Sequence, residues 1–178
     1  MLDGESKIIE KAVGGEASAF GLLYDHYQPS IYRFVIIKVS RREEAEDLTH
    51  QVFLNAWQNI GKYRDLGFPF SSWLYHIARN LIIDHYRGKR DNLNVDDMEN
   101  ELMAEISNLP DTLTEIKMEM ARVRQAITKL SPLHQDVIIM RFVEELSIKE
   151  VAQAVNKSEG AVKLLQHRAM EQLKKILK

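Results

Sequence analysis

The densest group of side chains that could bind a ligand lies between residues 68 and 87. Apolar residues recur there at helical spacing: Phe70, Leu74, Ile77 and Leu81. The opposite face and its surroundings carry Ser72, His76, Arg79, Asn80, Arg87, Phe68 and Tyr75. Aromatic rings beside cations suit the capture of unpaired nucleic-acid bases, because any base can stack and the backbone is anionic. The alternative is that the aromatic residues belong to the core, and we favour it for Trp73.

A second group of candidate binding residues lies near the C-terminus, from Ser147 to Arg168. The run Ser147-Ile148-Lys149-Glu150 is a capping box, Asn156 stands where a tight turn needs left-handed backbone, and Ser158 can cap a following helix. This spacing is typical of a helix-turn-helix, whose second helix enters the major groove of DNA.

The second helix of this motif presents the side chains that could touch bases. Its outward positions are Glu159, Gly160, Lys163, Gln166, His167 and Met170. Lys163 has the chemistry to bond guanine and Gln166 to bond adenine, whereas Arg168 suits a phosphate. The alternative is an ordinary helical hairpin whose polar face is only solvated.

The formal net charge of −2 hides an uneven distribution of charge. Basic residues dominate residues 62–90 and 157–178, whereas between residues 91 and 119 Lys117 is the only base among nine acids. Such a pattern favours two contact surfaces for a polyanion, with solvated helix faces as the alternative.

Helical periodicity predicts an all-α protein made of two small domains. A kink or break is expected at Pro29, and Ser71 or Ser72 is the expected cap of the third helix. The helices are predicted at residues 19–34, 42–57, 71–90, 113–130, 134–144, 148–155 and 159–177. Residues 91–112 are acidic and lack a sustained apolar period, which predicts a flexible linker. The two domains that it joins are predicted at residues 1–90 and 113–178.

Several classes of protein are excluded or disfavoured. The chain has no cysteine, which excludes disulfides, cysteine-ligated zinc and a cysteine nucleophile. It has no glycine-rich phosphate loop, no secretory signal and no apolar run long enough to span a bilayer. A metal site at His76, Asn80 and Asp84, which share a helix face, is the remaining enzymatic alternative. We predict a non-enzymatic protein without metal or cofactor.

Two motifs in this order, separated by an acidic segment, resemble a known family. The pattern F-x-x-W-L-x-x-I-A-x-N-x-x-x-D-x-x-R at residues 70–87 resembles the promoter-melting segment of extracytoplasmic-function sigma factors of the sigma-70 family. Residues 46–53 resemble the segment that docks on the polymerase clamp helices. Residues 130–132 and 160–163, with His167-Arg168, resemble the second conserved domain. The resemblance covers about residues 17–90 and 113–177.

The resemblance implies a role for each matching position. It implies that polymerase is bound by Glu44, Asp47 and Gln51. It implies that the single-stranded DNA of the −10 element is bound by Arg64, Phe68, His76, Arg79, Asn80, Arg87 and Arg90. The duplex DNA of the −35 element would be bound by Ser158, Lys163, Gln166, His167 and Arg168. The implied partners are core RNA polymerase, promoter DNA and an anti-sigma factor, in the cytoplasm of a bacterium and without membrane insertion.

The chain departs from the family pattern at two places. His50-Gln51 replaces the more usual Gln-Glu of the clamp motif, and Leu164-Leu165-Gln166 replaces a commoner Ser-Arg-apolar run. The detail of the polymerase contact and the promoter sequence therefore cannot be transferred from relatives.

Two other function classes remain as alternatives. A transcription regulator that does not dock on polymerase would explain the helix-turn-helix but not residues 70–87, and a helical adaptor would bind only protein. Duplex stacking is worth about 1.4 kcal/mol per step and base–aromatic stacking about 1–3 kcal/mol per base. One or two captured bases therefore cannot hold a long bubble open, and promoter melting requires the polymerase.

Overall fold

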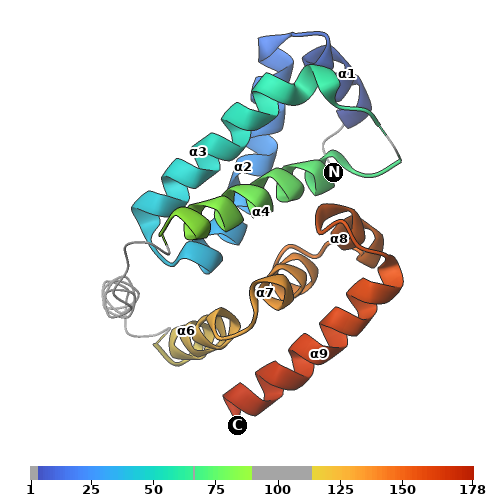
Figure 1. The fold of residues 1–178 in the computed structure, drawn as a ribbon. Coiled ribbons are helices and arrows are strands. Elements are labelled where there is room, and N and C mark those ends of the chain that lie inside the picture. Colours follow the sequence, from blue (N-terminus) through green and yellow to red (C-terminus); the bar gives the residue numbers. More distant parts are fainter. Residues whose placement is uncertain (1–3, 66, 90–113) are drawn as a thin grey trace.

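A computed structural model of the protein describes residues 4–65, 67–89 and 114–178, without the side chains of residues 89 and 114–118. Within these ranges the chain forms helices joined by short turns and contains no strand (Figure 1). The predicted all-α class is therefore confirmed. The predicted linker at residues 91–112 and the candidate residue Arg90 lie outside the described residues.

The N-terminal domain is built from four α-helices and a short 3-10 turn. They are α1 (Glu5–Val13), α2 (Ala17–Val39), α3 (Arg42–Asn59), η1 (Ile60–Lys62) and α4 (Phe70–Lys89). Helix α2 runs through Pro29 and continues to Val39, so the chain is not broken there. Helix α4 begins at Phe70, so neither Ser71 nor Ser72 is its cap. Helix α1 was not predicted from the sequence.

Apolar side chains at three- and four-residue spacing hold the N-terminal domain together. Leu23, Ile31 and Phe34 of α2 are fully buried, as are Val52 of α3 and Leu74 of α4. Aromatic rings close one end of this core, where Phe70 lies 5.7 Å from Tyr27, 5.3 Å from Tyr63 and 5.3 Å from Trp73 between ring centroids. Trp73 is therefore an aromatic residue packed on the core.

The C-terminal domain contains α6 (Thr114–Thr128), α7 (Pro132–Ile138), α8 (Ile148–Ala154) and α9 (Glu159–Leu177). The predicted helix at residues 134–144 is α7 followed by a π-helical turn, η4 (Ile139–Val143). Val137, Ile139 and Met140 point into a core that includes Val151 of α8 and Val162 of α9.

The turns of the helix-turn-helix have the predicted local geometry. The Ser147 hydroxyl accepts from the Glu150 backbone N–H at 3.2 Å, and the Glu150 carboxylate accepts from the Ser147 backbone N–H at 2.7 Å. Asn156 adopts a left-handed φ of 53° in the turn. Ser158 caps α9 by accepting from the Ala161 N–H at 3.2 Å. The capping box, the turn and the cap are all confirmed.

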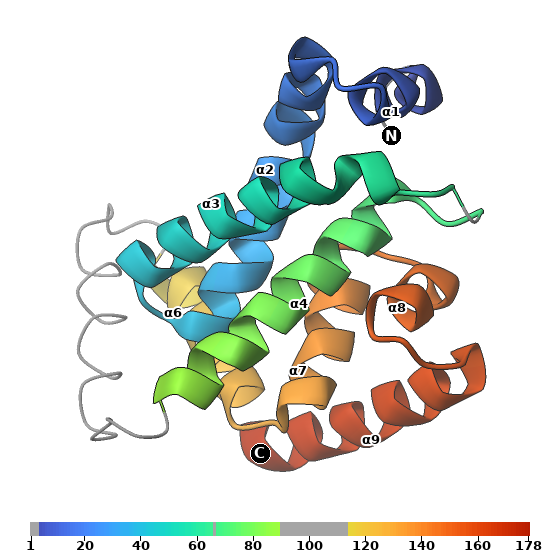
Figure 2. The same cartoon turned by 45° about the horizontal axis from the view of Figure 1, so that its top comes forward.

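The two domains pack directly against each other. Helix α4 contacts α8, and α2 contacts α6. Figures 1 and 2 show α4 alongside α7 and α8 in both views, with α9 on the far side of the C-terminal domain. One side of α4 therefore faces α2 and α3, and another faces the C-terminal domain.

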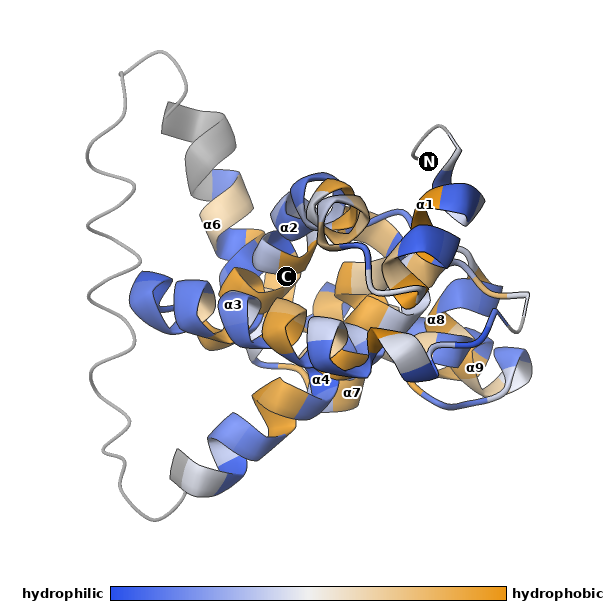
Figure 3. Ribbon diagram, turned by 90° about the horizontal axis from the view of Figure 1, so that it is seen from above, coloured by the Kyte–Doolittle hydropathy of each residue, from blue (hydrophilic) through white to orange (hydrophobic). Residues whose placement is uncertain are grey.

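Charged side chains concentrate on the outside of this assembly. Figure 3 shows the N-terminal end of α3 as hydrophilic, with apolar residues gathered where helices face one another. In the part of the chain that the structure describes, no helix is long and apolar enough to span a membrane.

We expect Ser147→Ala to lower the free energy of unfolding by about 1 kcal/mol, because one donor at the start of α8 loses its acceptor. The measurement is the urea midpoint of the full chain. Ser131→Ala is the matched control, since Ser131 precedes α7 but its side chain makes no capping hydrogen bond. An equal loss in both variants would contradict the role given to the Ser147 hydroxyl.

Candidate nucleic-acid and protein interfaces

An acidic face of α3 is open to solvent. Asp47 and Gln51 lie one turn apart and are both exposed, and the Gln51 amide donates to Asn55 Oδ1 at 2.8 Å. Leu54, one turn further on, is an apolar side chain that is 48% exposed. Negative charge disfavours DNA phosphate, so this face suits a protein partner.

Glu44 does not belong to the same face. Its side chain is only 17% exposed; one oxygen pairs with Arg41 at 3.3 Å, and the other lies 3.1 Å from His85 Nε2 on α4. The structure therefore places Glu44 between α3 and α4, away from Asp47 and Gln51. The sequence analysis had grouped these three residues as one polymerase-binding set.

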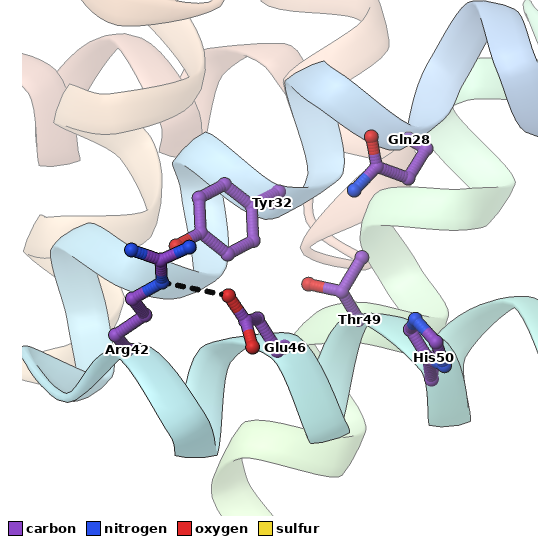
Figure 4. Close-up of a pocket in the computed structure, with 6 residues that line it drawn as sticks. All are labelled: Gln28, Tyr32, Arg42, Glu46, Thr49 and His50. Carbon is purple, nitrogen blue, oxygen red and sulfur yellow. Dashed lines mark hydrogen bonds and ion pairs between the residues drawn. The ribbon is translucent and has the colours of Figure 1, made fainter.

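A polar cavity of about 260 Å³ borders the α3 face. Figure 4 shows its lining residues from α2 and α3: Gln28, Tyr32, Arg42, Glu46, Thr49 and His50. The Arg42 guanidinium donates to Glu46 at 2.8 Å along one wall. The cavity adds a recess beside this face.

The α4 surface, which we define as Arg64, Phe68, His76, Arg79, Asn80 and Arg87, is only partly open. Arg64, Asn80 and Arg87 are exposed, whereas Phe68, His76 and Arg79 are partly covered by the C-terminal domain. Because α4 is packed on two sides, two further residues expected near this surface are buried. Ser72 is fully buried, with no hydrogen-bond partner for its hydroxyl, and Tyr75 packs edge-on against Phe34.

His76 links Asn80 to the C-terminal domain. Its Nδ1 lies 3.1 Å from the Ala154 carbonyl oxygen, and its Nε2 lies 3.1 Å from the Asn80 side-chain nitrogen. A neutral imidazole with the proton on Nδ1 satisfies both contacts, because Nδ1 then donates to the carbonyl and Nε2 accepts from the amide. The two residues are thus held in one orientation.

Helix α9 presents a largely cationic face to solvent. Lys163, His167 and Arg168 are all exposed, as is Ser158 at the start of the helix. Leu164 lies beside Lys163 and is an apolar side chain with 49% exposure. Cations suit phosphate and base-edge acceptors, and an exposed aliphatic side chain suits the methyl group of thymine.

The sequence predicted that Gln166 would point outward on this face, but in the structure its side chain is held by a neighbouring residue. It is half-buried, and its amide oxygen accepts from Arg141 Nε at 3.2 Å. Bidentate contact with adenine needs both the oxygen and the nitrogen of the amide. Gln166 must leave Arg141 before it can read a base, so its structural role is to join α9 to η4.

Comparison with known proteins decides the family. Two family models match the chain, Sigma-70 region 2 at residues 23–92 and Sigma-70 region 4 at residues 126–175. The chain belongs to the sigma-70 family. It directs RNA polymerase to promoters for transcription initiation. Sigma factors are generally not catalytic.

Curated relatives place this sigma factor in the extracytoplasmic-function group. It is 31% identical to the ECF RNA polymerase sigma factor SigW of Bacillus subtilis, over 97% of this chain and 96% of SigW. It is 37% identical to the ECF RNA polymerase sigma factor BldN of Streptomyces coelicolor, over 96% of this chain but 65% of BldN. The chain thus spans about two thirds of the length of BldN.

Solved structures share the fold. The structure of CnrH in complex with the cytosolic domain of CnrY matches with a TM-score of 0.73 at 22% identity, over 96% of this chain and 94% of that one. RpoE in complex with the anti-sigma factor NepR, from Bartonella quintana, matches with a TM-score of 0.69 at 19% identity, over 89% and 96%. These likenesses show the fold, and the two family models assign region 2 to residues 23–92 and region 4 to residues 126–175.

Proposed function

We propose that this sigma factor acts through three separate surfaces. The α3 face with Asp47, Gln51 and Leu54 binds core RNA polymerase, the α4 surface binds the unpaired strand of the −10 element, and the exposed face of α9 binds the duplex −35 element. The exposure of all three α3 residues, and of the cations on α9, supports this division. We assign residues 1–90 to region 2, 91–112 to a linker and 113–178 to region 4.

The α4 surface combines the two chemistries that unpaired DNA requires. Phe68 offers a ring for stacking, Asn80 offers an amide for a base edge, and Arg64 and Arg87 offer charge to the backbone. Stacking at about 1–3 kcal/mol per base cannot open many steps of duplex at about 1.4 kcal/mol each. The protein therefore captures bases in a bubble that the polymerase holds open.

Helix α9 supplies the sequence reading at the −35 element. Lys163 and His167 face base edges, Arg168 contacts phosphate, and Ser158 fixes the start of the helix at the groove. The exposed Leu164, where the chain departs from the family pattern, adds an apolar contact for a thymine methyl group. This predicts a preference for thymine at the base that Leu164 contacts.

The proposal also covers the location of the protein and its partners. The protein carries out no reaction of its own, acts in the bacterial cytoplasm where polymerase and DNA meet, and takes no metal or cofactor. An anti-sigma factor is a proposed partner, supported by the complexes in which the similar structures were solved.

The decisive experiment is binding to core polymerase. Asp47→Arg should weaken binding at least tenfold, about 1.4 kcal/mol, because it reverses the charge of the acidic residue on the α3 face. Glu10→Arg on α1 makes the same charge change at an exposed site outside the three surfaces. Titration of labelled core polymerase measures both, and equal affinities of the two variants would refute the assignment.

Promoter opening tests the α4 surface. In the holoenzyme, Asn80→Ala should reduce the permanganate reactivity of promoter thymines several-fold while leaving core binding unchanged, because one base contact is lost. Asn59→Ala, an exposed asparagine on α3, is the matched control. Full reactivity in the Asn80 variant, or strong reactivity with the sigma factor alone, would count against this role.

The −35 reading can be tested with a randomised promoter pool. Lys163→Ala should lower affinity by about 1–3 kcal/mol and relax the preference at one base position, because a base-edge contact disappears. Lys178→Ala removes an exposed lysine at the far end of α9 and should leave the preference intact. An unchanged selected sequence for Lys163→Ala would remove this residue from the readout.

A further inference from the structure

Two of the side chains that the proposed function gives to DNA, Arg64 and Phe68, lie between η1 and α4. We call the described residues of this connection, 63–65 and 67–69, the capture loop. Tyr63 at its start and Phe70 just after its end lie 5.3 Å apart between ring centroids, and Tyr63 also lies 5.1 Å from Trp73. Both ends of the capture loop therefore rest on one cluster of aromatic rings, and the way this cluster is held decides where the loop lies.

The capture loop is shaped by contacts within itself. The Gly67 backbone N–H donates to Asp65 Oδ1 at 2.9 Å, and Gly67 has a left-handed φ of 78°. Arg64 Nη1 donates to the carbonyl oxygens of Gly61 at 3.2 Å and Tyr63 at 3.0 Å. All of these contacts are local, so they set the shape of the loop without fixing it to another helix.

Helix α1 supplies a polar contact to the ring cluster. Tyr27 of α2 is 9% exposed, and its ring lies 5.7 Å from that of Phe70. A buried phenol needs a hydrogen-bond partner, and the Tyr27 hydroxyl donates to the Glu5 carboxylate at the start of α1. Burial and this carboxylate raise the pKa of Tyr27, so the phenol stays protonated and remains a donor near neutral pH.

The same helix packs on the start of the capture loop. Helix α1 contacts both α2 and η1, and its Ala12 is fully buried. Figures 1 and 2 show α1 beside the end of α3, from which η1 leads into the loop. Burial, together with the carboxylates of Asp65 and Glu5, raises the pKa of Tyr63. The Glu5 carboxylate thus acts on two phenols of the ring cluster.

We propose that α1 positions the capture loop for the unpaired strand, with the hydrogen bond between Tyr27 and Glu5 as its anchor. The inference rests on the proposed function of the α4 surface. Glu5 and Tyr27 are positioning residues, because neither belongs to the surface that meets DNA. The match to Sigma-70 region 2 begins at residue 23, so α1 lies outside the segment that this family model covers.

Preorganisation is the physical reason why such an anchor affects base capture. A loop that becomes ordered only on binding loses part of its contact energy to conformational entropy. A loop that is already fixed at both ends loses less. Tyr27 packs on Phe70 at one end of the capture loop, and α1 packs on η1 at the other, so one helix acts on both ends.

Binding to a pre-opened promoter tests this role. The probe is a promoter fork, chosen from the randomised pool, that is single-stranded across the −10 element, and its reference is the same fork with abasic sites there. In the holoenzyme, Tyr27→Phe should lower the ratio of the two affinities about two- to tenfold, the range of one net hydrogen bond. The ring on Phe70 is kept, so only the anchor to α1 is lost.

Variants of α1 separate the anchor from a general loss of stability. Glu5→Ala should lower the ratio to a similar extent, and the double variant should lose no more than either single one, because both changes remove the same hydrogen bond. Glu5→Gln should keep most of the ratio, since its amide oxygen still accepts from Tyr27. Glu10→Ala, at an exposed glutamate of the same helix, is the matched control.

Affinity for core polymerase should stay unchanged in all of these variants. An unchanged ratio in Tyr27→Phe and Glu5→Ala, an equal loss in Glu10→Ala, or a parallel loss of core binding would overturn the role of α1. Asn80→Ala distinguishes this failure from that of the proposed function. If Asn80→Ala lowers the ratio and Tyr27→Phe does not, only the inference about α1 fails; if the unaltered holoenzyme binds both forks equally, both fail.

Discussion

The burial of Asp136 between Lys38 and Arg79 is the interaction on which the relative position of the two domains depends. A carboxylate that is 1% exposed loses most of its hydration and is tolerated only with cations and hydrogen bonds around it. Those cations come from α2 and α4 of region 2. Region 4 can therefore cover region 2 only in the orientation that brings Asp136 between them, and the position of α8 over His76 follows.

Within each domain, by contrast, the arrangement depends on apolar periodicity. The exposed face of α3 is what remains after Val52 and Ala56 turn into the core, and the exposed face of α9 remains after Val162 and Ala169 do the same. The exposure of these two faces does not depend on how the two domains pack against each other. The α4 surface alone depends on the domain arrangement, because region 4 covers one of its sides.

This difference explains what could be predicted from the sequence. Local signals sufficed for most helices, for the capping box at Ser147 and for the left-handed Asn156, since each rests on neighbours along the chain. They failed for Ser72 and Tyr75, because a helix packed on two sides buries more than one stripe. They failed again for Gln166, whose partner Arg141 is 25 residues away. Helix α1 carries apolar residues at Ile8, Ile9, Ala12 and Val13, but with only 9 residues its periodic pattern is too short to be recognised.

The sequence did contain a signal for the interdomain pairing. Lys38 stands in the run Val35-Ile36-Ile37-Lys38-Val39, and Asp136 precedes Val137-Ile138-Ile139. A charge within an apolar run must find a counterion if it is buried. Only the structure shows that these two satisfy each other. Because separation of the domains would rehydrate both groups, the pair fixes the orientation of the domains more than it stabilises their contact.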